Sequence, residues 1–201
     1  MLIGYEDAQN ALNPYYEQLW KIVTSSWEKY NSLPEEYTSI ASKRGRATVV
    51  NDFVVALARQ LSFDDSRFQN IEINGMFCLL IPTDVGLFAI RLKKLNIDGT
   101  SSNQLTKQVK SFKEHEEIAG LENAYHLEMG YVLNDYEEFN AVMIACPSGE
   151  KSICWKAEVT THGVVNGEEE LFASDTIEPN KYGFKVVRKD IIGDENEATG
   201  S

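Results

Sequence analysis

Two apolar runs, Met76–Ile81 and Leu87–Leu92, lie near the middle of the chain and are separated by Pro82-Thr83-Asp84-Val85-Gly86. Their Phe, Ile, Leu and Cys residues suit a buried, pleated surface, and Pro, Asp and Gly between them are typical of a turn. A buried helix is the competing interpretation, but a break containing Pro and Gly argues against it. We therefore predict a β-hairpin, preceded by a short strand at Ile71–Ile73. Neither run alternates, so both faces should be covered, as in a central strand.

Three stretches have the three- and four-residue apolar spacing of an amphipathic helix. They cover residues 13–31, about 46–62 and about 104–117, and a shorter helix is predicted over 35–42. Asn13 can cap the first helix, with Pro14 in its first turn, where a missing N–H costs nothing. The last helix carries a lysine at every third position, which we interpret as a solvated face: Lys107, Lys110 and Lys113.

The second half of the chain is rich in strand patterns. Residues 124–133 alternate cleanly, which predicts a strand with one buried face and with His126 and Glu128 on the other face. A second hairpin is predicted from 139–146 and 153–160. We expect a turn at 163–167, and then edge strands at 168–172 and 182–188. Because strands and helices come in runs, the pattern indicates an α+β fold with a central, mostly antiparallel sheet.

We expect one α+β domain over 1–193, with 1–42 as a helical lead-in, and a disordered tail at 194–201, which is small, polar and acidic. No apolar run approaches the roughly 20 residues needed to cross a bilayer, and the N-terminus lacks a signal-peptide pattern. A cytoplasmic protein that does not interact with membranes is therefore expected. Nothing in the sequence fixes the oligomeric state.

Charge is distributed unevenly along the chain. The net charge is −12, but residues 43–113 carry +5, between an N-terminal segment at −4 and residues 114–201 at −13. Such asymmetry is typical of an interaction surface. Basic residues, and an amide- and hydroxyl-rich loop at 96–104, are therefore the candidate binding residues: Arg44, Arg46, Arg91, Lys93, Lys94, Asn96, Asp98, Ser101, Ser102, Asn103 and Gln104. In the alternative interpretation, Arg91 and Lys93 pair with acidic residues of 114–201.

Motifs for catalysis and cofactor binding are not found in the sequence. There is no Gly-rich phosphate-binding pattern and no spacing of His or Cys that favours a metal, so no catalytic residue, metal or cofactor is predicted. The three cysteines are read as buried free thiols. A turn at 147–150 would place Cys146 opposite Lys151 and Cys154 opposite Met143, so the two thiols would not be cross-strand partners.

Two resemblances to families add expectations. A helix, three strands, a helix and a strand over about 46–133 resemble the core of the PD-(D/E)XK nucleases, whose third strand carries an acidic-x-Lys motif that helps bind Mg²⁺. Here the matching triplet is Arg91-Leu92-Lys93, with a cation in place of the carboxylate, and the second strand offers no Asp. If the fold is shared, the resemblance implies an inactive metal site, because Mg²⁺ takes oxygen ligands.

The second resemblance rests on four short segments between residues 91 and 133. The pattern R-x-K-K-L, D-G-x-S-S-N, T-x-Q and G-Y-x-L is similar to an uncharacterised bacterial family of phage and mobile-element neighbourhoods, often near regulators of the Xre and ImmA/IrrE kinds. This resemblance implies that the protein is encoded near phage or mobile-element genes, and it implies no particular activity.

Three functional hypotheses follow. The first is a non-enzymatic interaction or regulatory protein of a phage, mobile element or defence locus. It would bind a protein partner, or nucleic acid, through the basic central region. The second is a PD-(D/E)XK-like nuclease, active or degenerate. The third is an acidic inhibitor that mimics nucleic acid, suggested by the charge of 114–201.

Overall fold

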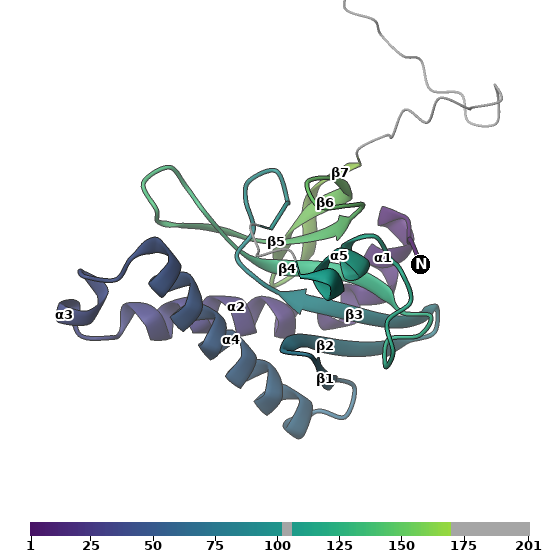
Figure 1. Ribbon diagram of the computed structural model, residues 1–201, viewed down its shortest axis with the longest axis horizontal. Coiled ribbons are helices and arrows are strands. Elements are labelled where there is room, and N and C mark those ends of the chain that lie inside the picture. The colour runs from purple at the N-terminus through teal and green to yellow at the C-terminus, as the bar shows by residue number, and fades with distance from the viewer. Residues whose placement is uncertain (102–105, 170–201) are drawn as a thin grey trace, which may run out of the picture. The chain divides into compact units, whose positions relative to one another are not determined.

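The computed structural model describes residues 1–101 and 106–169 and is built on one seven-stranded sheet (Figure 1). The strands lie side by side in sequence order. Their bounds are β1 Gln69–Ile73, β2 Met76–Thr83, β3 Gly86–Leu92, β4 Tyr125–Leu133, β5 Phe139–Pro147, β6 Ile153–Thr160 and β7 Gly163–Glu169. With the helices described below, this confirms the predicted α+β class and the hairpin between β2 and β3. The predicted edge strand at 182–188 and the tail at 194–201 lie outside the described residues.

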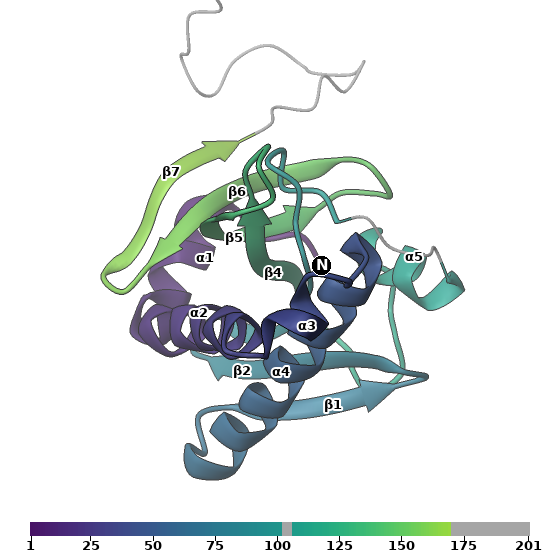
Figure 2. The same cartoon turned by 90° about the vertical axis from the view of Figure 1, so that its left-hand side faces the viewer.

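Neighbouring strands are antiparallel except β3 and β4, which are parallel. A parallel pair needs a crossover connection, and here the crossover contains the short helix α5, Lys107–Lys113. In Figure 2 α5 lies on the outer side of the curved sheet, opposite the long helices. The prediction that β4 has one solvated face is therefore wrong. From His126 onward, every residue of β4 is buried, because the crossover covers the second face.

The long helices pack on the inner face of the sheet (Figure 2). They are α1 Tyr5–Leu12, α2 Tyr16–Asn31 and α4 Lys43–Asp64, connected by the 3₁₀ turn η1 Asn13–Tyr15 and the four-residue helix α3 Glu35–Thr38. Of the predicted helix 13–31, residues 13–15 form the 3₁₀ turn η1, and the α-helix begins at Tyr16. The chain is already helical before Pro14, and Asn13 is not the N-cap of either element. At the start of α4, by contrast, the Ser42 hydroxyl accepts a hydrogen bond from the Gly45 N–H at 3.0 Å.

The main hydrophobic core lies between these helices and the sheet. Leu19 and Val23 of α2, and Val50 of α4, pack with inward residues of the central strands, such as Ile90 and Leu127. A smaller core on the outer face contains Cys78, Ala89 and Phe112. Trp155 ties the N-terminus to β6, because its indole N–H donates to the carbonyl of Ile3 at 2.9 Å. No helix in the described ranges is both long and apolar enough to cross a membrane.

Two local predictions in the last strands are wrong. The predicted turn at 163–167 is part of β7. The tight connection between β6 and β7 lies at Thr161-His162 and not between Gly163 and Gly167. In the β5–β6 hairpin, a β-bulge shifts the register between Cys146 and Pro147, so that Cys146 pairs with Trp155, and Pro147 with Ile153. Cys154 is then the extra residue beside Cys146.

Candidate functional site

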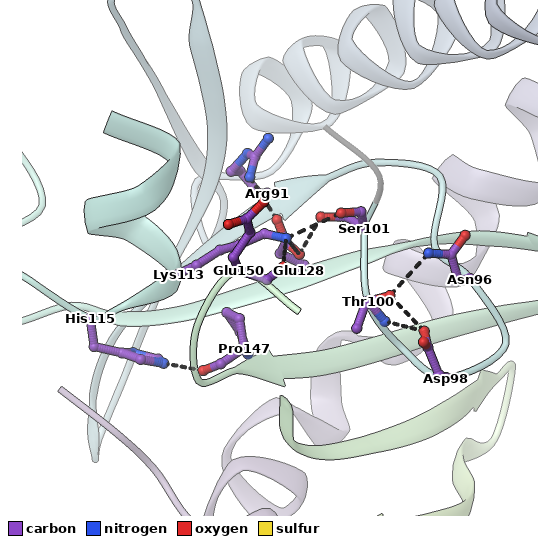
Figure 3. A network of polar contacts seen from close by, with 10 residues as sticks. All are labelled: Arg91, Asn96, Asp98, Thr100, Ser101, Lys113, His115, Glu128, Pro147 and Glu150. Atoms are coloured by element: carbon purple, nitrogen blue, oxygen red, sulfur yellow. Dashed lines mark hydrogen bonds and ion pairs between the residues drawn. The ribbon is translucent and has the colours of Figure 1, made fainter. Parts of the chain in front are cut away.

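A buried charge cluster lies at the centre of the outer face, around the carboxylate of Glu128 (Figure 3). In the parallel β3–β4 register Arg91 is directly opposite Glu128, and the Arg91 Nη1 donates to Glu128 Oε1 at 2.6 Å. Both side chains are almost fully buried, with 2% and 1% of their residue surface exposed. The interpretation that Arg91 pairs with an acidic residue of 114–201 is thus confirmed.

Lys113 and Ser101 complete the cluster from the α5 crossover. The Ser101 hydroxyl donates to Glu128 Oε2 at 2.6 Å, and the Lys113 ammonium lies 3.8 Å from the same oxygen. Lys113 also donates to the carbonyls of Ser101 at 3.2 Å and Glu150 at 3.1 Å. The expectation that Lys113 faces solvent is wrong, since it is 2% exposed. The cluster joins the sheet, α5 and the β5–β6 turn, and its carboxylate has no access to a substrate.

A small cavity of about 230 Å³ lies beside this cluster, at the end of β3. Its lining contains two cations and no carboxylate: Asn74, Gly75, Met76, Arg91, Lys93, Thr106, Gln108 and Val109. The Arg91 Nε is buried and has no hydrogen-bond partner within the described residues. Burial, and then the charge of Arg91, lower the pKa of Lys93. Both effects disfavour the charged form of Lys93, so positive charge is energetically unfavourable at this place.

Two histidines lie on the same outer face, in a stack with Phe112. The rings of Phe112 and His126 are 4.4 Å apart, and those of His126 and His115 are 5.5 Å apart. The His126 Nδ1 lies 3.0 Å from the Phe112 carbonyl, and the His115 Nε2 lies 2.6 Å from the Pro147 carbonyl. Burial lowers the pKa of His126 to about 4 and also lowers that of His115. Both rings are therefore neutral packing groups at physiological pH.

The loop at residues 96–101, predicted to carry ligand-binding groups, is organised by its own side chains (Figure 3). Asp98 Oδ1 accepts hydrogen bonds from the Thr100 N–H at 2.9 Å and hydroxyl at 2.7 Å, and Asn96 donates to the Thr100 hydroxyl at 3.0 Å. Lys156 of β6 donates to the Ile97 carbonyl at 3.1 Å. These hydrogen bonds stabilise a turn at residues 96–100 and attach it to β6. Ser102, Asn103 and Gln104 lie outside the described residues.

One end of the molecule brings together the other predicted binding residues. Lys43 and Arg46, at the start of α4, both pair with Glu137 in the β4–β5 hairpin, Lys43 at 2.6 Å. A shallow groove of about 580 Å³ separates this hairpin from the loop containing Lys94, Asn96 and Asp98. Arg44 is exposed on the first turn of α4.

Sequence reasoning missed the apolar side chains of this end. Tyr37, Ile40, Ile97 and Tyr136 are exposed, Ile40 at 81% and Tyr136 at 85%. Tyr136 immediately precedes Glu137, and Ile40 lies three residues before Lys43, which pairs with Glu137. We call residues 37–46, 94–98 and 134–138 the α4–hairpin surface, because the Glu137 ion pairs join the first segment to the third and the groove lies between the second and the third. No sequence pattern marks these residues, because each is an apolar residue in a mostly polar segment.

The basic middle of the chain does not form one basic face. Seven of its cations are in ion pairs with acidic side chains: Lys43, Arg46, Arg59, Arg67, Arg91, Lys110 and Lys113. They are distributed over both ends of α4, the start of β1, the interior of the sheet and α5. Arg59 and Arg67 pair with carboxylates of the same segment, and the other five cations pair with three carboxylates from 114–201: Glu114, Glu128 and Glu137.

The element order expected from the nuclease resemblance is present, from α4 through β1, β2, β3 and α5 to β4. The chemistry of that site is different, because Arg91 is bound to Glu128, and the β2 residue level with Arg91 is Cys78. Among residues 1–101 and 106–169, no three His, Cys, Asp or Glu side chains are arranged to hold a metal ion.

Comparison with known proteins yields no match to any family model, curated protein or solved structure.

Proposed function

We propose that this protein is a non-enzymatic interaction protein that binds a protein partner through the α4–hairpin surface. The observation that carries the proposal is that Tyr37, Ile40 and Tyr136 are exposed on the two segments that the Glu137 ion pairs join. The setting of a phage, mobile element or defence locus comes from the resemblance of residues 91–133. In this setting, we expect the partner to be a regulatory protein encoded by the same locus.

The chemistry of the surface suits a protein better than nucleic acid. Tyr and Arg are enriched at protein interfaces and dominate their binding energy, and this surface exposes two tyrosines together with Arg44. Nucleic-acid binding depends on cations that are free to neutralise phosphates. Here Lys43 and Arg46 are occupied by Glu137, and the whole chain carries −12.

Affinity capture from the native host tests the proposal, using the full chain, the variants Tyr136→Ala and Ile40→Ala, and a matched control. Phe63→Ala is the control, since Phe63 is 87% exposed but lies at the other end of α4. We expect specific proteins to be retained by wild type and Phe63→Ala and lost from the two surface variants. The loss for a central aromatic residue should be about thirtyfold in affinity.

Nuclease treatment of the extract separates protein from nucleic acid as the partner. Retention that survives the treatment supports the proposal. Retention that disappears with nuclease, or that is equal for all four chains, contradicts it.

A nuclease of the PD-(D/E)XK type is the second candidate, favoured by the α4-to-β4 element order and by Lys93 at the lysine position. It predicts Mg²⁺-dependent cleavage of DNA or RNA that is lost in Lys93→Ala. If the wild-type chain cleaves no nucleic acid with any divalent metal, this candidate fails. The acidic-mimic hypothesis is weakened, because Glu128 is buried and Glu137 is already paired with cations.

A further inference from the structure

We propose that the cavity between the end of β3, the β1–β2 turn and the start of α5 binds a phosphate group, either as inorganic phosphate or as the phosphate of a small ligand. The residues that would hold it are Arg91, Lys93, Thr106, Gln108 and Asn74. This site is separate from the α4–hairpin surface and does not depend on the function proposed for that surface.

The first argument is a charge imbalance around the cavity. Arg91 and Lys113 are both 2% exposed, and Glu128 is the one buried carboxylate within the described residues. Lys93 adds a third, half-buried cation and has no carboxylate within ion-pair distance among those residues. The other carboxylate that acts on Lys93 is that of Asp52, which is exposed on α4 and lines a neighbouring cavity that Lys93 also borders, outside ion-pair distance. Buried charge is costly unless it is compensated, so a site with excess +2 favours a dianion.

The second argument is the convergence of hydrogen-bond donors. The Arg91 Nε–H is buried and without a partner in the described part of the chain, while the Arg91 Nη1 is occupied by Glu128. Lys93, Thr106, Gln108 and Asn74, whose side chains can all donate hydrogen bonds, line the same space from three segments. A tetrahedral oxyanion offers acceptors in several directions, whereas a planar carboxylate offers them in one plane.

The third argument is size. About 230 Å³ is below the roughly 300–1,000 Å³ of pockets that hold whole drug-sized ligands. The cavity therefore suits one phosphate group, with the remainder of any larger ligand outside. This geometry favours a phosphate monoester or the free ion over an internal phosphate of a nucleic-acid chain.

Calorimetric titration of the full chain with inorganic phosphate tests the site, at constant ionic strength and at about pH 8, where inorganic phosphate and phosphate monoesters are both mostly dianionic. We expect measurable binding, and a midpoint of thermal unfolding that rises with phosphate but not with equivalent chloride. Lys93→Met keeps the aliphatic stem, removes the charge and should weaken binding about tenfold or more. Lys110→Ala removes an exposed lysine of α5, the helix that contributes Gln108 to the cavity; its pair with Glu114 is 3.8 Å long. This variant should bind phosphate as wild type does.

Gln108→Glu gives a second, independent readout. The new carboxylate would supply the missing negative charge from within the chain. It should abolish phosphate binding and raise the phosphate-free unfolding midpoint above that of wild type. Equal effects of phosphate and chloride on wild type would overturn the proposal. Phosphate binding that is unchanged in Lys93→Met and Gln108→Glu would also overturn it.

Titration with a phosphate monoester and with its dephosphorylated counterpart distinguishes the two sources of the group. Tighter binding of the monoester than of inorganic phosphate identifies a small phosphorylated ligand. Equal binding identifies the free ion. Binding of the dephosphorylated compound as tightly as the monoester would contradict the site.

Discussion

Arg91 and Glu128 face each other across the parallel β3–β4 pair, with 2.6 Å between the guanidinium nitrogen and the carboxylate oxygen. They are 37 residues apart in sequence, and the α5 crossover that joins their strands also supplies Lys113 and Ser101 to the same carboxylate. One carboxylate therefore links β3, β4 and the crossover. Breaking such a buried pair costs much more than its net contribution to stability, because the remaining charges stay buried.

Glu128→Gln should destabilise the fold by about 3–5 kcal/mol, since Arg91 and Lys113 would be left without a carboxylate. Chemical denaturation at neutral pH measures this loss. Glu72→Gln is the matched control, because its 2.6 Å pair with Arg59 is exposed on both sides; it should cost no more than about 1 kcal/mol. Similar losses for the two variants would show that Glu128 is not the centre of a buried charge cluster.

The same pair predicts a coupling in a double-mutant cycle. Arg91→Met removes one of the two cations that Glu128→Gln leaves uncompensated. It should therefore be less destabilising in the Glu128→Gln background than in wild type, by about 0.5–3 kcal/mol. Denaturation of the two single variants and the double variant gives this coupling energy, and strictly additive losses would contradict direct interaction.

Gly130→Ala tests a close approach of two backbone segments. After β3, the chain continues along β4, with the Lys93 N–H bonded to the Met129 carbonyl at 2.8 Å. A Cβ on Gly130 would lie 1.5 Å from the Lys93 carbonyl oxygen. A backbone oxygen cannot rotate away, so we expect a loss at or above the roughly 1–3 kcal/mol of ordinary overpacking.

Thermal unfolding and soluble yield measure the effect of that substitution. Gly4→Ala is the control, since the nearest atom to its added Cβ is 3.9 Å away. If Gly130→Ala unfolds at the same temperature as wild type, residues 93–95 do not lie against β4 as described.

Local pattern was sufficient for most of the fold. The hairpin of β2 and β3 was predictable, because its apolar runs and its Pro–Asp–Gly turn lie next to each other in sequence. The bulge beside Cys146 and the strand β7 were not, because neither is marked by apolar spacing. The helix α1 was missed since residues 5–12 have only two buried positions, Ala8 and Leu12.

The buried face of β4 could have been inferred from topology. Alternation placed His126 and Glu128 on a solvated face, but a parallel β3–β4 pair requires a crossover that covers one face of the sheet. Lys113, at the end of the crossover helix α5, then faces the sheet and not solvent. The meeting of Lys43, Arg46 and Glu137 was beyond sequence reasoning, because it depends on where the β4–β5 hairpin lies in space.

His126 predicts a loss of stability on mild acidification. Its pKa falls from 6.5 to about 4 on folding because the ring is buried. The unfolded chain therefore binds a proton between these values while the folded chain does not, so stability decreases as the pH falls below about 6.5. The expected loss is about 2 kcal/mol between pH 7 and pH 5, to which His115 adds with the same sign.

Denaturation at the two pH values measures this slope. His126→Asn keeps a donor for the Phe112 carbonyl but does not titrate, and it should flatten the slope. His162→Asn, at an exposed position, should leave it unchanged. A wild-type slope that persists in His126→Asn would assign the acid sensitivity to another group.

Cys154 is predicted to be the reactive thiol of the folded protein. The β-bulge places it beside Cys146, and hydrogen bonding with the Cys146 thiol lowers the pKa of Cys154 to about 7. Burial raises the pKa of Cys78 to about 12, and hydrogen bonding with Cys154, followed by burial, raises the pKa of Cys146. Since the thiolate is the nucleophile, iodoacetamide should modify Cys154 first, with a rate that rises through pH 7.

Mass spectrometry of the alkylated peptides follows all three cysteines. Unfolded protein is the reference, in which they should react at similar rates near the ordinary thiol pKa of about 8.5. Cys146→Ala removes the hydrogen-bonding thiol while leaving Cys154 in place, so the Cys154 rate at neutral pH should fall and its pH midpoint should rise. A midpoint unchanged by Cys146→Ala would mean that the two thiols do not interact across the bulge, and faster modification of Cys78 or Cys146 would contradict their burial.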